Sequence, residues 1–188
     1  MMRSIARFIA PIAVLGLWWV QLQGASIGGW KPQALENAKH AVARFRSADP
    51  GLEPFFAKAH GFVVFPNVAK GALGVGGARG KGMLFEQGAP IGEAILTQFT
   101  IGFQAGGQAY SELIFFQNKE TLDDFTEGRF EFSAQASAVA IRAGASADAA
   151  FDSGVAVFTM AKAGLMYEAS VGGQKFSYEP LTEAAAQN

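Results

Sequence analysis

The chain has 188 residues, of which half are hydrophobic and 16% are charged, so it can form a packed domain and is not composed like a disordered segment. The formal net charge is −1, from 15 basic and 16 acidic residues. This balance argues against general nucleic-acid binding, which needs a strongly basic surface. Cysteine is absent, which excludes disulfides, thiolate nucleophiles and cysteine-ligated metal sites.

Residues 1–28 have the pattern of an export signal. Two arginines give a basic start, and an apolar run follows at 8–20, before several small residues. A helix that spans a bilayer needs about 20 apolar residues, so this run is short for a membrane anchor. The adjacent Trp18 and Trp19 are typical of an interfacial belt, and an uncleaved anchor stays open as the alternative. In either case we expect an exported protein in the periplasm or cell envelope.

Two helices are predicted at the start of the domain. Apolar residues recur at three- and four-residue steps from Leu35 to Phe45, which predicts an amphipathic helix over Gln33–Ser47. Pro50 disfavours helical conformation in the residue before it and ends this helix. A second, short helix is predicted over Leu52–Ala59.

The following pattern is that of strands separated by turns that contain glycine. The predicted strands are Phe62–Phe65, Ala72–Ala78, Lys81–Glu86, 98–105, Tyr110–Phe116, Phe130–Ile141, Val155–Lys162, Leu165–Val171 and Gln174–Tyr178. One face of the clearest alternation carries Phe99, Ile101, Phe103 and Ala105. Gly172 and Gly173 predict a hairpin turn into the last strand.

One further helix, capped by Asn118 and ending near Glu127, interrupts the strands. Short strands with glycine turns favour antiparallel pairing, and alanine and glycine on the strands allow another layer to approach closely. The predicted fold class is α+β, with N-terminal helices packed on a mainly antiparallel, Gly/Ala-rich sheet or partly closed barrel. We expect a single domain over residues 29–182 and a frayed tail at 183–188.

The glycine-rich run around Gly80 and Lys81 suggests a nucleotide site but lacks its defining residues. A phosphate loop needs a leading glycine and a final serine or threonine, whereas Val75 and Gly82 occupy those positions here. A dinucleotide-binding pattern also fails, because Arg79 stands where its third glycine is required. We therefore predict no nucleotide and no cofactor, and we interpret these glycines as positions where strands turn and pack closely.

Catalytic and metal-binding patterns are equally weak. His40 and His60 have no second ligand at a metal-binding spacing, and the serines lack the context of a nucleophile elbow. We predict no catalytic residue and no metal site, and hence a protein that is not an enzyme. The unassigned acids and serines leave an unrecognised hydrolase as a weaker alternative.

Several segments in order resemble the SYLF domain, a lipid-binding module also known as the yeast-type actin-binding domain. They are Ala59–Gly71, 74–77, 80–84, Thr100–Gln108, 113–116, 118–125 and Lys162–Glu168. The resemblance covers about Gln33–Tyr178. The chain departs from the family pattern at Val139–Ala145, which contains no proline, so partner contacts made by that segment in other members are not carried over.

The resemblance implies binding of phosphoinositides or another anionic phospholipid through an amphipathic segment at the start of the domain, here Gln33–Ser47. The expected lipid-binding residues are Lys39, Arg44, Phe45 and Arg46, with Leu35 and Val42 inserting beside Phe45. The alternative interpretation of this segment is a helix packed on the core with solvated basic side chains.

We thus expect a non-enzymatic lipid- or membrane-surface-binding module exported to the cell envelope. A structural or protein-interaction component of the envelope, without specific lipid binding, is the alternative. An exported protein does not meet actin, so actin is not an expected partner.

Overall fold

The computed structural model describes residues 32–132, 137–163, 169–171 and 173–181. The predicted export signal and C-terminal tail lie outside these residues. The described part contains three α-helices, a short 3-10 helix and six strands. None of the helices in these ranges combines the length and the apolar character needed to cross a bilayer.

The predicted helices are confirmed to within one or two residues. Helix α1 spans Pro32–Ala48, and a 3-10 turn at Pro50–Leu52 leads into α2 at Glu53–Lys58. Helix α3 spans Lys119–Thr126, and the Asn118 side chain accepts a hydrogen bond from the backbone amide of the third residue beyond it, as a helix cap does.

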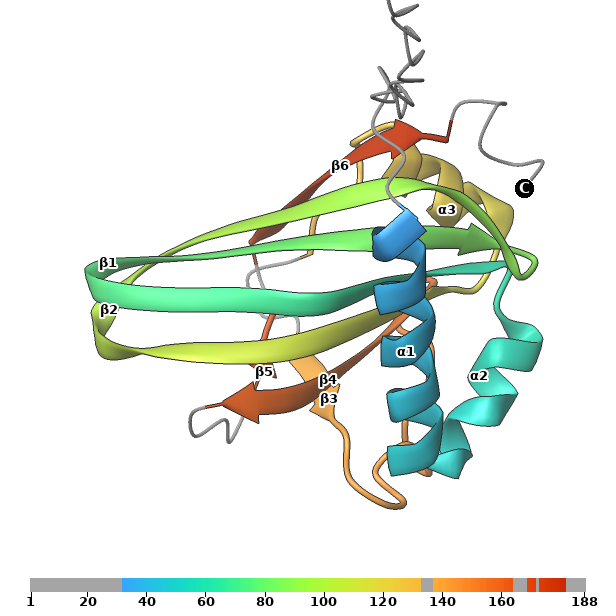
Figure 1. The fold of residues 1–188 in the computed structure, drawn as a ribbon, viewed down its shortest axis with the longest axis horizontal. Coiled ribbons are helices and arrows are strands. Elements are labelled where there is room, and N and C mark those ends of the chain that lie inside the picture. Colours follow the sequence, from blue (N-terminus) through green and yellow to red (C-terminus); the bar gives the residue numbers. More distant parts are fainter. Residues whose placement is uncertain (1–31, 133–136, 164–168, 172, 182–188) are drawn as a thin grey trace, which may run out of the picture.

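Strands β1 (Gly61–Glu86) and β2 (Ala89–Phe116) form one long antiparallel ribbon. Gln87 and Gly88 join them, and both have positive φ angles, which suit a tight hairpin. The strands predicted within residues 62–86 are therefore parts of a single strand. Each strand of the ribbon runs outward and turns back on itself, so that the ribbon has a bent end (Figure 1).

Glycine allows the two halves of β1 to lie close together. The Gln87 amide donates a hydrogen bond of 3.1 Å to the carbonyl of His60, which ties the two ends of the strand. A Cβ atom on Gly82 would lie 2.7 Å from the Val64 carbonyl oxygen and 2.6 Å from the Phe65 ring. Because one of these neighbours is backbone, only glycine fits without displacement. Close packing, predicted for the glycine run, is confirmed at this position.

Strand β2 pairs along its C-terminal half with β4 (Val155–Ala163) and along its N-terminal half with β6 (Gln174–Pro180). Strand β3 (Ser137–Ala140) runs parallel to β4 and pairs with β5 (Ala169–Ser170). A mixed fold with a mainly antiparallel sheet is confirmed, and the described strands form an open sheet. The predicted hairpin between the last two strands falls partly on residues outside the description. Of the described residues, β5 pairs with β3, and β6 pairs with the distant β2.

The sheet has two apolar sides, which we call the inner face and the outer face. Helix α3 packs on the inner face, in a cluster that includes Phe65, Leu84, Leu96, Ile114, Phe116, Phe125 and Phe176. Helices α1 and α2 pack on the outer face, in a cluster that includes Ala38, Phe45, Leu52, Phe55, Val64, Met83, Leu113, Phe115 and Phe158. Figure 1 shows α1 lying across the strands of the ribbon, away from its bent end.

The alternation around Phe99 does not bury the aromatic side chain. Phe99 is 82% exposed, whereas its neighbour Gln98 is 2% exposed. Leu96 and Ala94 are buried on the inner face, and alternation along β2 places Gln98 on that face and Phe99 on the outer one. The side chains of the other residues predicted to share this face, at 101–105, lie outside the description.

The role of glycine in the fold can be tested by comparing Gly82→Ala with Gly71→Ala. A Cβ on Gly82 meets the carbonyl of Val64, whereas one on Gly71 meets nothing within 4 Å. We expect Gly82→Ala to lower the free energy of unfolding by about 1–3 kcal/mol and Gly71→Ala to change it little. Urea unfolding followed by circular dichroism measures both values. Equal effects of the two substitutions would contradict the close packing.

Candidate functional site

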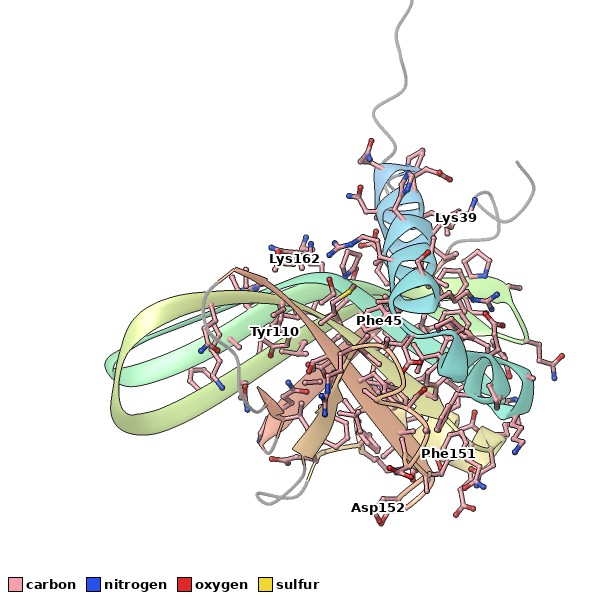
Figure 2. The ribbon with its side chains drawn as sticks, turned by 90° about the horizontal axis from the view of Figure 1, so that it is seen from below. Lys39, Phe45, Tyr110, Phe151, Asp152 and Lys162 are labelled. Carbon is pink, nitrogen blue, oxygen red and sulfur yellow. The ribbon has the colours of Figure 1, made fainter. Side chains whose placement is uncertain are left out.

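The apolar stripe of α1 faces the sheet. Phe45 is fully buried together with Ala38 and Ala41, and Leu35 and Val42 are half-buried against the same cluster. The prediction that Phe45 inserts into a membrane is therefore corrected, because this ring contributes to the core in the folded protein (Figure 2). The alternative interpretation of the helix, with its apolar stripe packed on the core, describes the observed arrangement.

Two of the predicted lipid-binding cations are next to acids. Lys39 Nζ lies 3.0 Å from a carboxylate oxygen of Glu36, and the Arg46 guanidinium lies 3.4 Å from a carboxylate oxygen of Glu53. Arg46 also lies 4.0 Å from the centre of the Phe56 ring. Lys39 and Arg46 are seven residues apart and share one side of α1. Their charges are thus partly balanced, although such exposed pairs add little stability.

Arg44 lies on a different side of α1 from Lys39. Burial and the positive charge of Arg44 together lower the pKa of the Lys162 ammonium on β4. Figure 2 shows Lys39 and Lys162 on opposite sides of α1. Neither Arg44 nor Lys162 forms an ion pair within the part of the chain that the structure describes. The structure therefore divides the predicted site into two groups.

Two further cations lie on the outer face beside the N-terminal part of α1. Arg79, Lys81 and Met83 occupy every second position of β1 and therefore share one face of the strand. Met83 belongs to the cluster under α1. Together with Gln33 and Asn37 of α1, they line a cavity of about 540 Å³. Both cations are exposed, and neither forms an ion pair with any described residue.

The exposed Phe99 is close to these cations. Arg79 pairs with Thr97 across the ribbon, and Phe99 follows Thr97 by two residues, so Phe99 and Arg79 are diagonal neighbours on one face. We call the set Arg44, Arg79, Lys81, Lys162 and Phe99 the cationic face. Of its members, sequence reasoning identified only Arg44 as a lipid contact. Arg79 and Lys81 alternate along β1 with buried residues, and this alternation was the signal for those two cations.

A polar group is buried on the inner face. Glu112 of β2 is fully buried, and Gln174 Nε2 donates a hydrogen bond of 3.0 Å to its Oε2 atom. Burial raises the pKa of Glu112 to about 7, against the smaller opposing effects of Gln174 and Lys70. Burial, with a further effect of Glu112, raises the pKa of Tyr110. A protein interior stabilises the neutral form of a carboxyl group that has few partners.

These groups do not form a metal centre in the described part of the chain, where no cluster of three or more His, Cys, Asp or Glu side chains is present. His60 Nε2 lies 2.8 Å from a carboxylate oxygen of Glu86 and ties the start of β1 to its end. The chemistry available at Glu112 is the gain and loss of a proton close to neutral pH.

The raised pKa of Glu112 makes the free energy of unfolding depend on pH. Its pKa is about 7 in the folded protein and about 4.5 ordinarily, so the folded protein binds more protons between these values. The free energy of unfolding therefore falls as pH rises from about 4.5 to about 7, by about 3 kcal/mol at most. We expect Glu112→Gln to remove this loss, as measured by urea unfolding across that range. Exposed Glu120→Gln is the control, and an unchanged pH dependence in Glu112→Gln would contradict the assignment.

Comparison with known proteins agrees with the sequence motifs. Residues 97–185 match the family model Ysc84, which is described as "Las17-binding protein actin regulator". The chain is also 27% identical over 152 residues to Beta cell expansion factor A of Aeromonas veronii. That match covers 79% of this chain and 57% of the relative, so the chain spans little more than half of the relative's length. The resemblance to the SYLF, or Ysc84, family is confirmed over residues 97–185.

Proposed function

We propose that this protein is a non-enzymatic module that binds anionic membrane surfaces through its cationic face. The match to this family supports a lipid- or actin-related binding domain in general. The observation that favours lipid is the position of Phe99, which is 82% exposed beside cations that have no acidic partner among the described residues. An exposed aromatic ring within a basic surface is suited to the boundary between headgroups and acyl chains.

The strength of this interaction can be approximated from its parts. Each basic residue near an anionic surface contributes about 1 kcal/mol, and the cationic face offers four. Transfer of the Phe99 ring from water to the membrane adds about 2 kcal/mol. The sum describes weak and reversible binding, because docking also restricts the motion of the protein. Salt should weaken it, since much of the sum is electrostatic.

The cavity between α1 and β1, which Arg79 and Lys81 line, is the expected position of a lipid headgroup. Asn37 and the cations Arg79 and Lys81 offer hydrogen-bond donors to a phosphate group. Glu93 lines the same cavity, and its carboxylate repels an anion that enters deeply. We therefore place the anionic surface at the exposed cations.

The proposal predicts which cations matter for membrane binding. We expect Arg79→Glu with Lys81→Glu to lower partitioning onto phosphatidylglycerol-containing vesicles at least about tenfold, because two attractive charges become repulsive. Lys39→Glu with Arg46→Glu is the matched control, since it makes the same change of charge on the other side of α1. Co-sedimentation at low salt, with pure phosphatidylcholine vesicles as a second control, measures the partitioning.

Two results of this experiment would contradict the proposal. An equal or larger loss in the Lys39 and Arg46 variant would return the site to the other side of α1. Absence of vesicle binding by the unmodified protein at low salt would favour the alternative function, a structural or protein-interaction component of the envelope.

We also propose that the protein is exported, on the pattern of residues 1–28 alone. We expect the mature protein to lack this segment and to occur in the periplasmic or envelope fraction. Mass spectrometry of the mature N-terminus, together with cell fractionation, measures both properties. An intact leader on a protein found only in the cytoplasm would contradict export, whereas an intact leader in the membrane fraction would identify an anchor.

A further inference from the structure

A second cavity, of about 630 Å³, lies between α2 and the connection at 141–152, which joins β3 to β4. Phe55 and Phe151 form an aromatic part of its lining, with their ring centres 5.4 Å apart. Figure 2 labels Phe151, which lies near α2. Small side chains complete the wall, namely Ala147, Ala149 and Ala150. Pockets for small molecules commonly have about 300–1,000 Å³ and a mainly apolar lining.

The wall of this pocket is held in place by one buried carboxylate. Asp49 is 1% exposed and lies at the corner between α1 and α2. It accepts hydrogen bonds from the backbone amides of Ser146 at 2.8 Å, Gly51 at 3.0 Å and Gly144 at 3.3 Å. Because these amides come from both sides of the pocket, Asp49 fixes the connection against the helices before any ligand arrives. A preformed wall lowers the entropic cost of binding.

Two polar side chains, Lys58 and Gln117, lie at the edge of the lining, whereas Ser146 is buried in its wall. Lys58 is exposed at the C-terminal end of α2 and forms no ion pair with any described residue. Gln117 follows β2 and is exposed in the same lining, where its amide can donate a hydrogen bond. A mainly apolar cavity with one cation and one amide at its edge is complementary to a molecule with an apolar chain and a single anionic end.

We propose that this pocket binds a single-chain amphipathic anion, with its apolar chain against Phe55 and Phe151 and its anionic group at Lys58. A carboxylate at the end of a medium-length hydrocarbon chain has this chemistry. The site is separate from the cationic face, because α2 and the connection at 141–152 contribute nothing to that face. It takes one soluble molecule, whereas the cationic face meets a membrane surface.

The test is calorimetric titration of the full chain with decanoate, kept below the concentration at which it forms micelles. We expect saturable binding of one decanoate per chain. Ala150→Phe should weaken it about tenfold or more by filling the pocket, and exposed Ala143→Phe on the same connection is the matched control. Lys58→Met should weaken it about fivefold, the scale of one exposed ion pair, with Lys175→Met on β6 as control. Urea unfolding establishes that each variant is folded.

Three outcomes would overturn the proposal. They are no saturable binding of decanoate to the unmodified protein, equal binding of decyltrimethylammonium, and undiminished binding in folded Ala150→Phe. The variant with Arg79→Glu and Lys81→Glu should bind decanoate normally. This result separates the pocket from the proposed membrane function, because either can fail while the other stands.

Discussion

The close approach of the two halves of β1 is the constraint on which the rest of the structure depends. Gly82 makes it possible, because a side chain there would meet the backbone of Val64. Once β1 folds back, β2 must follow it through continuous pairing, and one long ribbon becomes a curved sheet with two faces. The inner face receives α3, and the outer face receives α1 and α2. Glycine in this run thus serves the backbone and does not cradle a nucleotide.

The same geometry explains the position of the cationic face. Alternation along β1 puts Arg79 and Lys81 on the face that α1 covers, but beside the helix and not beneath it. Phe99 lies outside the apolar cluster under α1 and is 82% exposed. On the opposite face Glu112 is buried with few partners and keeps its proton to about pH 7. The cationic face and Glu112 therefore lie on opposite faces of the same sheet.

Local patterns predicted much of this fold. Periodicity located α1, and the Asn118 cap located α3, because both signals depend on neighbouring residues. The pairing of β6 with β2 was missed, since nothing local distinguishes a hairpin from a return to a distant strand. Phe45 was misassigned for a related reason: an apolar stripe shows that a helix has a partner, but not whether that partner is a sheet or a membrane. The cationic face joins residues from four elements, α1, β1, β2 and β4, and only the folded ribbon brings them to one side.

The most direct measurement of the central claim uses the absence of cysteine, which allows one labelled position at a time. An environment-sensitive fluorophore would be attached to Phe99→Cys or, in a separate sample, to Lys39→Cys, and each protein mixed with phosphatidylglycerol-containing vesicles. If the cationic face binds the membrane, the label at position 99 should show blue-shifted emission and quenching by spin-labelled lipid, with little change for the label at position 39. Insertion of the label at position 39 with none at position 99 would contradict membrane binding by the cationic face.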